Sequence, residues 1–155
     1  MRKAFTLIEM VVGIGVFAAV ILMGTMMMVS TLRASKKAAA VALVRNEGAN
    51  ALGVMTSFIR YADSITSCAS TSLVIKTNNQ DTVTFTCIVN SSDYYLASNS
   101  ARLTSVNVKV GNCGIFTCGT NSVGINFSLS KAGTSTLVET TAASTFETTV
   151  VLRNK

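Results

Sequence analysis

The 155-residue sequence has no histidine, no proline and no tryptophan. Histidine is the most frequent general base and supplies the ring nitrogens of many metal sites, so its absence removes that chemistry. The absence of proline leaves a long helix without a built-in kink. Charged residues make up only 13% of the chain, and no five of like sign stand together. We therefore expect no enzyme and no bound cofactor or metal.

Charge is missing altogether from residues 10–32, which are mostly apolar. A helix rises about 1.5 Å per residue, so this stretch is long enough to cross a hydrocarbon core of about 30 Å. A secretory signal peptide is the alternative, but its apolar core is shorter and ends at a small-residue cleavage site, which is not clear here. Basic residues flank the stretch on both sides, so the positive-inside rule does not fix its orientation. The sequence predicts a membrane-spanning helix.

One acid, Glu9, stands at the head of this apolar stretch. A carboxylate inside a membrane helix costs roughly a few kcal/mol unless it is near water or paired. If the chain were cut before Phe5, the new α-amine would lie one helical turn from Glu9 on the same face, and a neighbouring copy could supply the same amine. A solvated charge at the membrane interface is the alternative interpretation of Glu9.

The segment Phe-Thr-Leu-Ile-Glu, which runs from Phe5 to Glu9 after a short basic leader, resembles the processing site of type IV pilins and type II secretion pseudopilins. The resemblance covers about the first fifth of the chain. It implies that a prepilin peptidase cuts between Ala4 and Phe5 and N-methylates Phe5, and that Glu9 pairs with a neighbour's terminus during assembly. Ala4 stands where the family usually has glycine, and the mid-helix proline of major pilins is missing, which favours a minor pilin or a pseudopilin-like protein.

The resemblance implies a structural role. We expect a subunit of a type IV pilus or related filament, which is first a single-pass inner-membrane precursor and then part of an extracellular or periplasmic filament. Its partners would be other pilin subunits and the prepilin peptidase. A looser likeness of residues 58–65 and 146–152 to J-type minor pilins implies a place near the filament tip. The alternatives are a pseudopilin of a type II secretion system and a membrane-anchored module in which Lys76, Arg102 and Lys109 contact DNA or a surface ligand.

Beyond the uncharged stretch, small and apolar residues recur every three or four positions, which is typical of one face of a helix. These residues are Val41, Val44, Gly48, Ala51, Met55, Phe58 and Ala62, with Leu52 and Ile59 beside them. The pattern predicts that the helix continues to about residue 62 and covers a sheet with this stripe. A coiled coil is the competing explanation.

After Ser67 the apolar period changes from 3.6 to 2, which indicates antiparallel strands with one buried face. The expected strands are residues 73–77, 82–89, 94–97, 106–110, 123–130 and 146–152, with a hairpin turn at 78–81. The prediction is an α+β fold with a long N-terminal helix packed on an antiparallel sheet, as in pilins. The expected segments are a leader, 1–4, a transmembrane or filament-core helix, 5–32, an amphipathic helix, 33–62, and a sheet domain, 63–155.

The four cysteines follow the expected membrane helix, and an even number in an oxidising compartment favours disulfides. Three pairings are possible. We expect Cys113 to pair with Cys118 across a small loop, and Cys68 with Cys87. Zinc is the rival, but it favours closely spaced cysteine pairs, and with no histidine its site would have to be all-cysteine.

Overall fold

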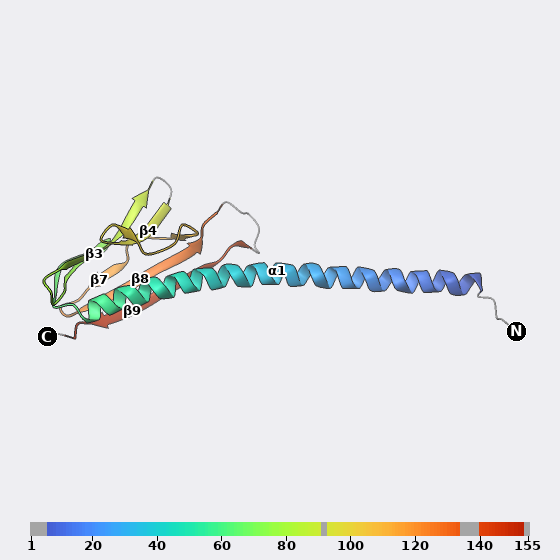
Figure 1. The fold of residues 1–155 in the computed structure, drawn as a ribbon, viewed down its shortest axis with the longest axis horizontal. Helices are drawn as coiled ribbons and strands as arrows, with labels where there is room; N and C mark the ends of the chain where they lie inside the picture. The colour runs from blue at the N-terminus through green and yellow to red at the C-terminus, as the bar shows by residue number, and fades with distance from the viewer. Residues whose placement is uncertain (1–5, 91–92, 134–139, 154–155) are drawn as a thin grey trace. The chain divides into compact units, whose positions relative to one another are not determined.

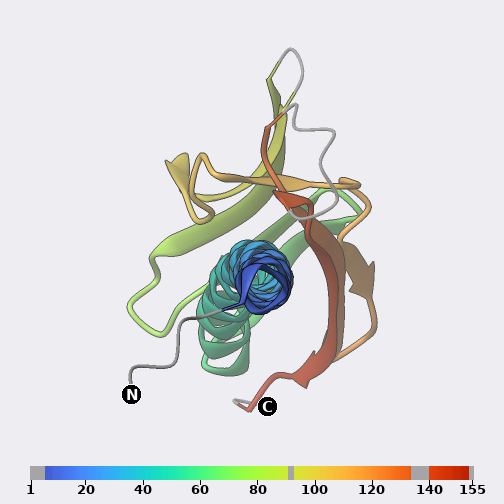
Figure 2. The same cartoon turned by 90° about the vertical axis from the view of Figure 1, so that its right-hand side faces the viewer.

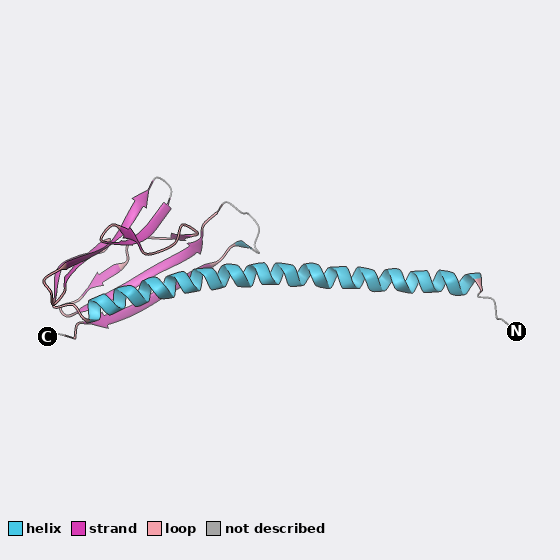
Figure 3. Cartoon of the chain, viewed as in Figure 1, coloured by secondary structure: helices cyan, strands magenta, loops and turns pink. Residues whose placement is uncertain are grey.

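The computed structural model describes residues 6–90, 93–133 and 140–153, which form one helix and nine strands (Figures 1 and 3). The chain divides into two compact units, Met1–Lys36 and Lys37–Lys155. Helix α1, Leu7–Arg60, provides nearly all of the first unit's described residues and continues into the second unit. The second unit also contains all the strands, so the α+β fold with a long N-terminal helix is confirmed.

Helix α1 has 54 residues and is continuous, as the absence of proline predicts. It begins after Thr6, whose carbonyl accepts hydrogen bonds from the amides of Glu9 and Met10 at 3.1 and 3.3 Å. It ends at Arg60, two residues before the expected end. There the amide of Asp63 donates to the carbonyl of Lys76 at 2.8 Å and leads the chain into the first sheet.

The strands form two antiparallel sheets, where one sheet was expected. The first has the order β1-β2-β3-β4-β5, and in the second β8 pairs with β6 and β7 along one edge and with β9 along the other. The strands are β1 Ser64–Ala69, β2 Ser72–Lys76, β3 Thr82–Asn90, β4 Asp93–Ser98, β5 Ala101–Arg102, β6 Val108–Val110, β7 Phe116–Cys118, β8 Ser122–Lys131 and β9 Ala143–Val151.

All six expected strands are present, but β1, β5 and β7 were missed because they are short or polar. Strand β1 has the sequence Ser-Ile-Thr-Ser-Cys-Ala and shows little alternation of burial, so period-two analysis does not detect it. Val106, expected at the start of a strand, lies in a loop and is 71% exposed. Two of the unpredicted strands carry cysteines, since β1 contains Cys68 and β7 contains Cys118.

The predicted stripe on the helix is buried, with a small rotation. Its buried members are Ala40, Val44, Gly48, Ala51, Met55 and Ile59. Ile59 is fully buried, whereas Phe58, which was placed in the stripe, is 42% exposed. The stripe shares one core with apolar side chains from both sheets, so the coiled coil is not needed to explain its pattern.

Strand β9 runs alongside residues 37–60 of α1 and in the same direction (Figures 1 and 2). Three contacts occur in the same order along both elements. The Lys37 ammonium donates to the Thr141 carbonyl, Gly48 meets Phe146, and the Arg153 amide donates to the Arg60 carbonyl at 3.0 Å. Residues 37–60 rise about 35 Å as a helix, and residues 141–153 span about 40 Å when extended. The two elements therefore stay in register.

The closest approach between them is at Gly48. A Cβ atom built there would lie 2.1 Å from the Cζ atom of Phe146, which is far inside van der Waals contact. The Phe146 ring also stacks on Phe127 of β8, with ring centroids 5.3 Å apart and planes 22° apart. Only glycine leaves room for this ring to lie against the helix backbone.

Both expected disulfide pairings are wrong. The structure joins Cys68 to Cys118 and Cys87 to Cys113. Cys68 lies on β1 and Cys87 on β3, and β2 runs between these two strands. Two strand spacings amount to about 9.6 Å, which exceeds the Cα separation of about 4.4–6.8 Å that a disulfide spans. Cys118 ends the extended strand β7, which carries it away from Cys113.

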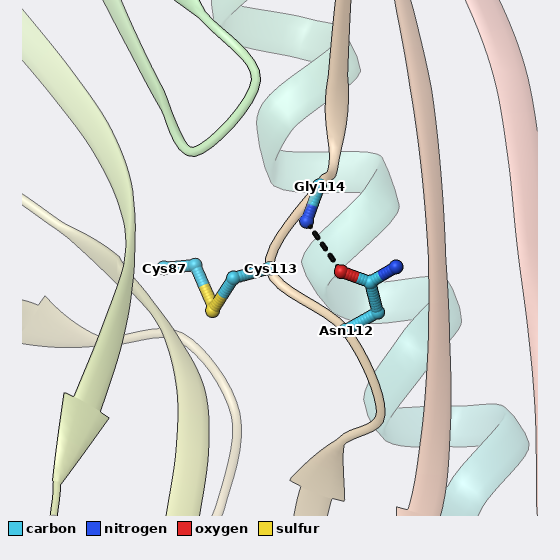
Figure 4. The surroundings of a disulfide bond; sticks show 4 residues. All are labelled: Cys87, Asn112, Cys113 and Gly114. Atoms are coloured by element: carbon cyan, nitrogen blue, oxygen red, sulfur yellow. Dashed lines mark hydrogen bonds between the residues drawn. A yellow bond between two sulfur atoms is a disulfide. The ribbon is translucent and has the colours of Figure 1, made fainter.

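The observed disulfides both connect one sheet to the other. Cys68 and Cys87 belong to the first sheet, Cys118 ends β7 of the second, and Cys113 lies in the segment between β6 and β7. Figure 4 shows Cys113 beside an Asn112 side chain that accepts a hydrogen bond from the Gly114 amide at 2.8 Å, and this bond fixes the local turn. All four cysteines are thus disulfide-bonded, and in this oxidised form none has a free thiolate to bind zinc.

We predict that Gly48→Ala destabilises the protein by about 1–3 kcal/mol, because the added methyl group overpacks against Phe146. The matched control is Gly53→Ala, five residues further along α1 at an exposed site with nothing within 4 Å of the added Cβ. This control should stabilise the helix by up to about 1 kcal/mol, the propensity difference between the two residues. Urea unfolding followed by circular dichroism measures both, and equal effects would contradict the close packing at Gly48.

We predict that peptide mapping without reductant recovers linked peptides containing Cys68 with Cys118, and Cys87 with Cys113. The bridged cysteines are 50 and 26 residues apart. On loop-entropy grounds, loss of either bridge by paired Cys→Ser substitution should cost roughly 3–4 kcal/mol of unfolding free energy. Recovery of a Cys113–Cys118 peptide would contradict the sheet arrangement.

Candidate functional site

The described residues of the first unit, 6–36, are helical from Leu7 onward, and all of them are exposed. Phe17, Leu22 and Met26 are 68%, 61% and 72% exposed, and the large apolar residues around them are similar. The most apolar window of α1 has a mean hydropathy of 2.4 and is not buried at all. By length and composition, α1 is able to cross a membrane. A continuous apolar surface of this kind needs an apolar partner, either lipid or other helices.

Three hydroxyl side chains interrupt the apolar residues 10–32, and each is satisfied inside the helix. Thr25 donates to the Leu22 carbonyl at 2.9 Å. Ser30 and Thr31 both donate to the Met27 carbonyl, at 2.8 and 2.9 Å. A polar group without a partner is expensive in hydrocarbon, so these bonds make the stretch compatible with a lipid environment.

Glu9 lies in the first turn of α1, where a negative charge interacts favourably with the helix dipole. Thr6 and Glu9 have the spacing of a capping box, in which the residue before the helix and the third residue within it satisfy each other's backbone amides. Met10, Gly13, Ile14 and Phe17 lie beside Glu9 on the exposed surface of α1, so the acid borders an apolar patch. The expected cleavage residues Ala4 and Phe5 lie outside the described residues.

The basic residues considered for DNA binding have other neighbours. Arg102 lies 4.5 Å from the centre of the Tyr95 ring and donates through Nε to the Thr104 carbonyl at 2.7 Å. Lys109 forms an ion pair with Asp93 at 2.5 Å. Lys76 ends β2. The ion pair with Asp93 reduces the charge that Lys109 offers to a phosphate backbone, whereas the ring and the carbonyl that Arg102 contacts are neutral and leave its charge in place.

A polar contact links α1 to the loop between β5 and β6. The Glu47 carboxylate accepts a hydrogen bond from the Ser105 amide at 3.0 Å, and it does so from the helix face that covers the sheets. Within the described ranges, no three histidine, cysteine, aspartate or glutamate side chains gather as metal ligands do. The acid at position 47 is therefore best explained as a structural link.

A shallow groove that the sequence did not predict lies beside the end of α1, where Phe58 and Tyr61 are 42% and 55% exposed. Phe58 was placed in the buried stripe because its spacing fits, and Tyr61 was not singled out. The available signals were the pair of aromatic residues three positions apart at the end of the helix and, separately, the asparagine-rich turn at 78–81. Those signals gain meaning only when the turn is known to lie against the helix.

Comparisons with known proteins add no relative. No family model, no curated protein and no solved structure matches the chain.

We predict that Ile21→Arg, near the middle of the uncharged stretch, lowers the amount of the chain in the membrane fraction, because the chain that fails to insert stays soluble or is degraded. A central arginine costs about 2.5–3.5 kcal/mol of insertion free energy. Val106→Arg is the control, since Val106 is exposed in a loop of the second unit. Alkaline extraction of membranes from expressing cells measures the partition. Equal partition of the two variants would contradict insertion of this stretch.

Proposed function

We propose that this chain is a structural subunit, a minor pilin or pilin-like protein, of a type IV pilus or related filament. The precursor sits in the inner membrane through α1. A prepilin peptidase cuts the bond between Ala4 and Phe5 and methylates the new amine of Phe5. The apolar helix then leaves the lipid for the filament core, where Glu9 pairs with the terminal amine of a neighbouring subunit. The second unit faces the extracellular or periplasmic medium.

The observation that carries this proposal is the division of one uninterrupted helix into two different surfaces. Residues 10–32 expose apolar side chains and satisfy their few hydroxyls internally. Residues 40–59 bury a single stripe against two sheets that are closed by disulfides. A lipid bilayer and a bundle of like helices are both apolar surroundings, so the same exposed helix suits the stored and the assembled state.

Two alternatives share these features. A pseudopilin of a type II secretion system would use the same processing and the same helix. A membrane-anchored module would keep its leader and present the second unit to DNA or to another surface ligand. The ion pair of Lys109 with Asp93 counts against the DNA-binding version of this module, because it reduces the positive charge available to phosphates. Prepilin-peptidase processing separates the anchored module from both filament proteins.

We predict that intact-mass analysis of the protein recovered from its own cells shows loss of residues 1–4 and one added methyl group on Phe5. Ala4→Gly should be cut at least as fast, because glycine is the residue that the family usually has before the cut. Ala4→Leu should accumulate the precursor because its side chain is larger. A full-length, unmodified chain in the cells would contradict the proposal and favour the anchored module.

We predict that Glu9→Gln leaves cleavage intact and lowers the amount of this subunit in sheared filaments at least severalfold, because the amide keeps the size of the side chain but loses its charge. Asp63→Asn is the matched control, since Asp63 is an exposed acid of the second unit whose backbone amide carries its hydrogen bond. Quantitative immunoblots of filament and membrane fractions provide the measurement. Equal incorporation of the two variants would exclude charge pairing at Glu9.

A further inference from the structure

A shallow groove of about 290 Å³ lies between the last turn of α1 and the turn that joins β2 to β3. Both walls belong to the second unit. The residues that line the groove are Ser57, Phe58, Tyr61, Thr77, Asn78 and Asn79. None of them is charged, although the chain as a whole carries a net charge of +6. The groove combines two aromatic rings with hydroxyl and amide groups.

The helix wall is aromatic and held in place. Phe58 and Tyr61 are three residues apart, so their side chains lie on the same face at the end of the helix. The Phe58 ring meets Phe85 of β3 edge to face, with centroids 6.1 Å apart, while 42% of the residue stays exposed. The Tyr61 amide donates to the Ser57 carbonyl at 3.2 Å, which extends the helical turn to this residue. The core packing thus orients one ring and leaves both accessible.

The opposite wall is a polar turn with its own hydrogen bonds. The Thr77 amide donates to the Asp81 carbonyl and the Gln80 amide to the Thr77 carbonyl, both at 2.9 Å. Gln80 has a φ of 67°, a left-handed conformation that non-glycine residues adopt uncommonly. This conformation closes the turn and leaves Asn78 and Asn79 exposed at its tip. A wall that is already ordered loses less conformational entropy when it binds a ligand.

We propose that this groove binds a neutral saccharide. The C–H face of a pyranose ring is apolar and stacks on an aromatic ring, and the sugar hydroxyls pair with amide side chains that both donate and accept. Because no lining residue is charged, a neutral sugar fits better than a sialylated or phosphorylated one. Drug-sized ligands occupy pockets of about 300–1,000 Å³, and this groove of about 290 Å³ lies just below that range, so it suits one or two sugar rings. The inference does not depend on cleavage or filament assembly.

A protein partner, including a second copy of this chain, fits the groove less well. Stable protein interfaces bury about 800 Å² and about 20–30 residues on each side. Six residues line this groove, and only two of them are large and apolar. The groove matches the size of a small ligand rather than that of a docking surface.

The test uses the full chain in detergent micelles with ring-labelled tyrosine. The chain has three tyrosines, Tyr61, Tyr94 and Tyr95, so their ring resonances are assigned by single substitution. The methyl glycosides of glucose, galactose, mannose and N-acetylglucosamine are titrated separately. At least one of them should shift the Tyr61 resonances with saturation, while those of Tyr94 and Tyr95 stay constant.

Variants make this test specific. Tyr61→Ala should weaken binding at least tenfold, and Asn79→Ala severalfold, whereas Tyr61→Phe should keep most of the affinity because the stacking ring remains. Tyr94→Ala is the matched control, since Tyr94 is 40% exposed on β4 and outside the groove. Asn79 and Tyr61 are exposed, so these variants should fold, and circular dichroism checks that they do.

Several outcomes would overturn the proposal. These are no saturable shift at Tyr61 with any of the four glycosides, equal shifts at all three tyrosines, or full affinity in Tyr61→Ala. A Tyr61 shift that follows protein concentration without sugar would instead make the groove a contact between copies. Cleavage before Phe5 is measured separately, so failure here leaves the proposed filament role standing, and the reverse also holds.

Discussion

The second unit depends on the closeness with which α1 approaches β9. At Gly48 the helix has no side chain, and the Phe146 ring fills that space while it stacks on Phe127. This contact sets the distance between helix and sheet at the middle of the pair. The Lys37 and Arg60 contacts then fix its two ends. Once the separation is set, the stripe from Ala40 to Ile59 meets both sheets and closes one shared core.

The disulfides hold together the two sheets that enclose the same core. Each one joins the first sheet to the second sheet or to the segment between its strands, so the two sheets that cover the helix are held to each other by covalent bonds. Small domains often lack enough buried apolar surface to be stable alone, and cross-links compensate by restricting the unfolded chain. Here the helix and the two bridges together enclose a core that neither sheet buries by itself.

Residue periodicity predicted the elements well and their assembly less well. The helix, its stripe and six strands follow from spacings of 3.6 and 2, which reflect local geometry. The division into two sheets does not, because β1 shows little alternation of burial and β7 has only three residues. The disulfide pairing failed for the same reason, since connectivity depends on which strands are neighbours and not on distance in sequence. The groove at Phe58 and Tyr61 was missed because its second wall comes from a turn about twenty residues away.

Glu9 illustrates how one charge can be suited to two states of a helix. In the full-length chain it sits in the first turn, at the capping-box spacing from Thr6 and at the positive end of the dipole. In the proposed mature subunit the chain begins at Phe5, and a positive amine then stands at that same end, where it opposes the dipole. A carboxylate one turn away offsets this amine, whether the amine belongs to the same subunit or to its neighbour. In the full-length chain the carboxylate of Glu9 is thus favoured by the helix dipole. In the proposed mature subunit it has an amine to pair with, which lowers the cost of moving this helix end from the membrane surface into an apolar filament core.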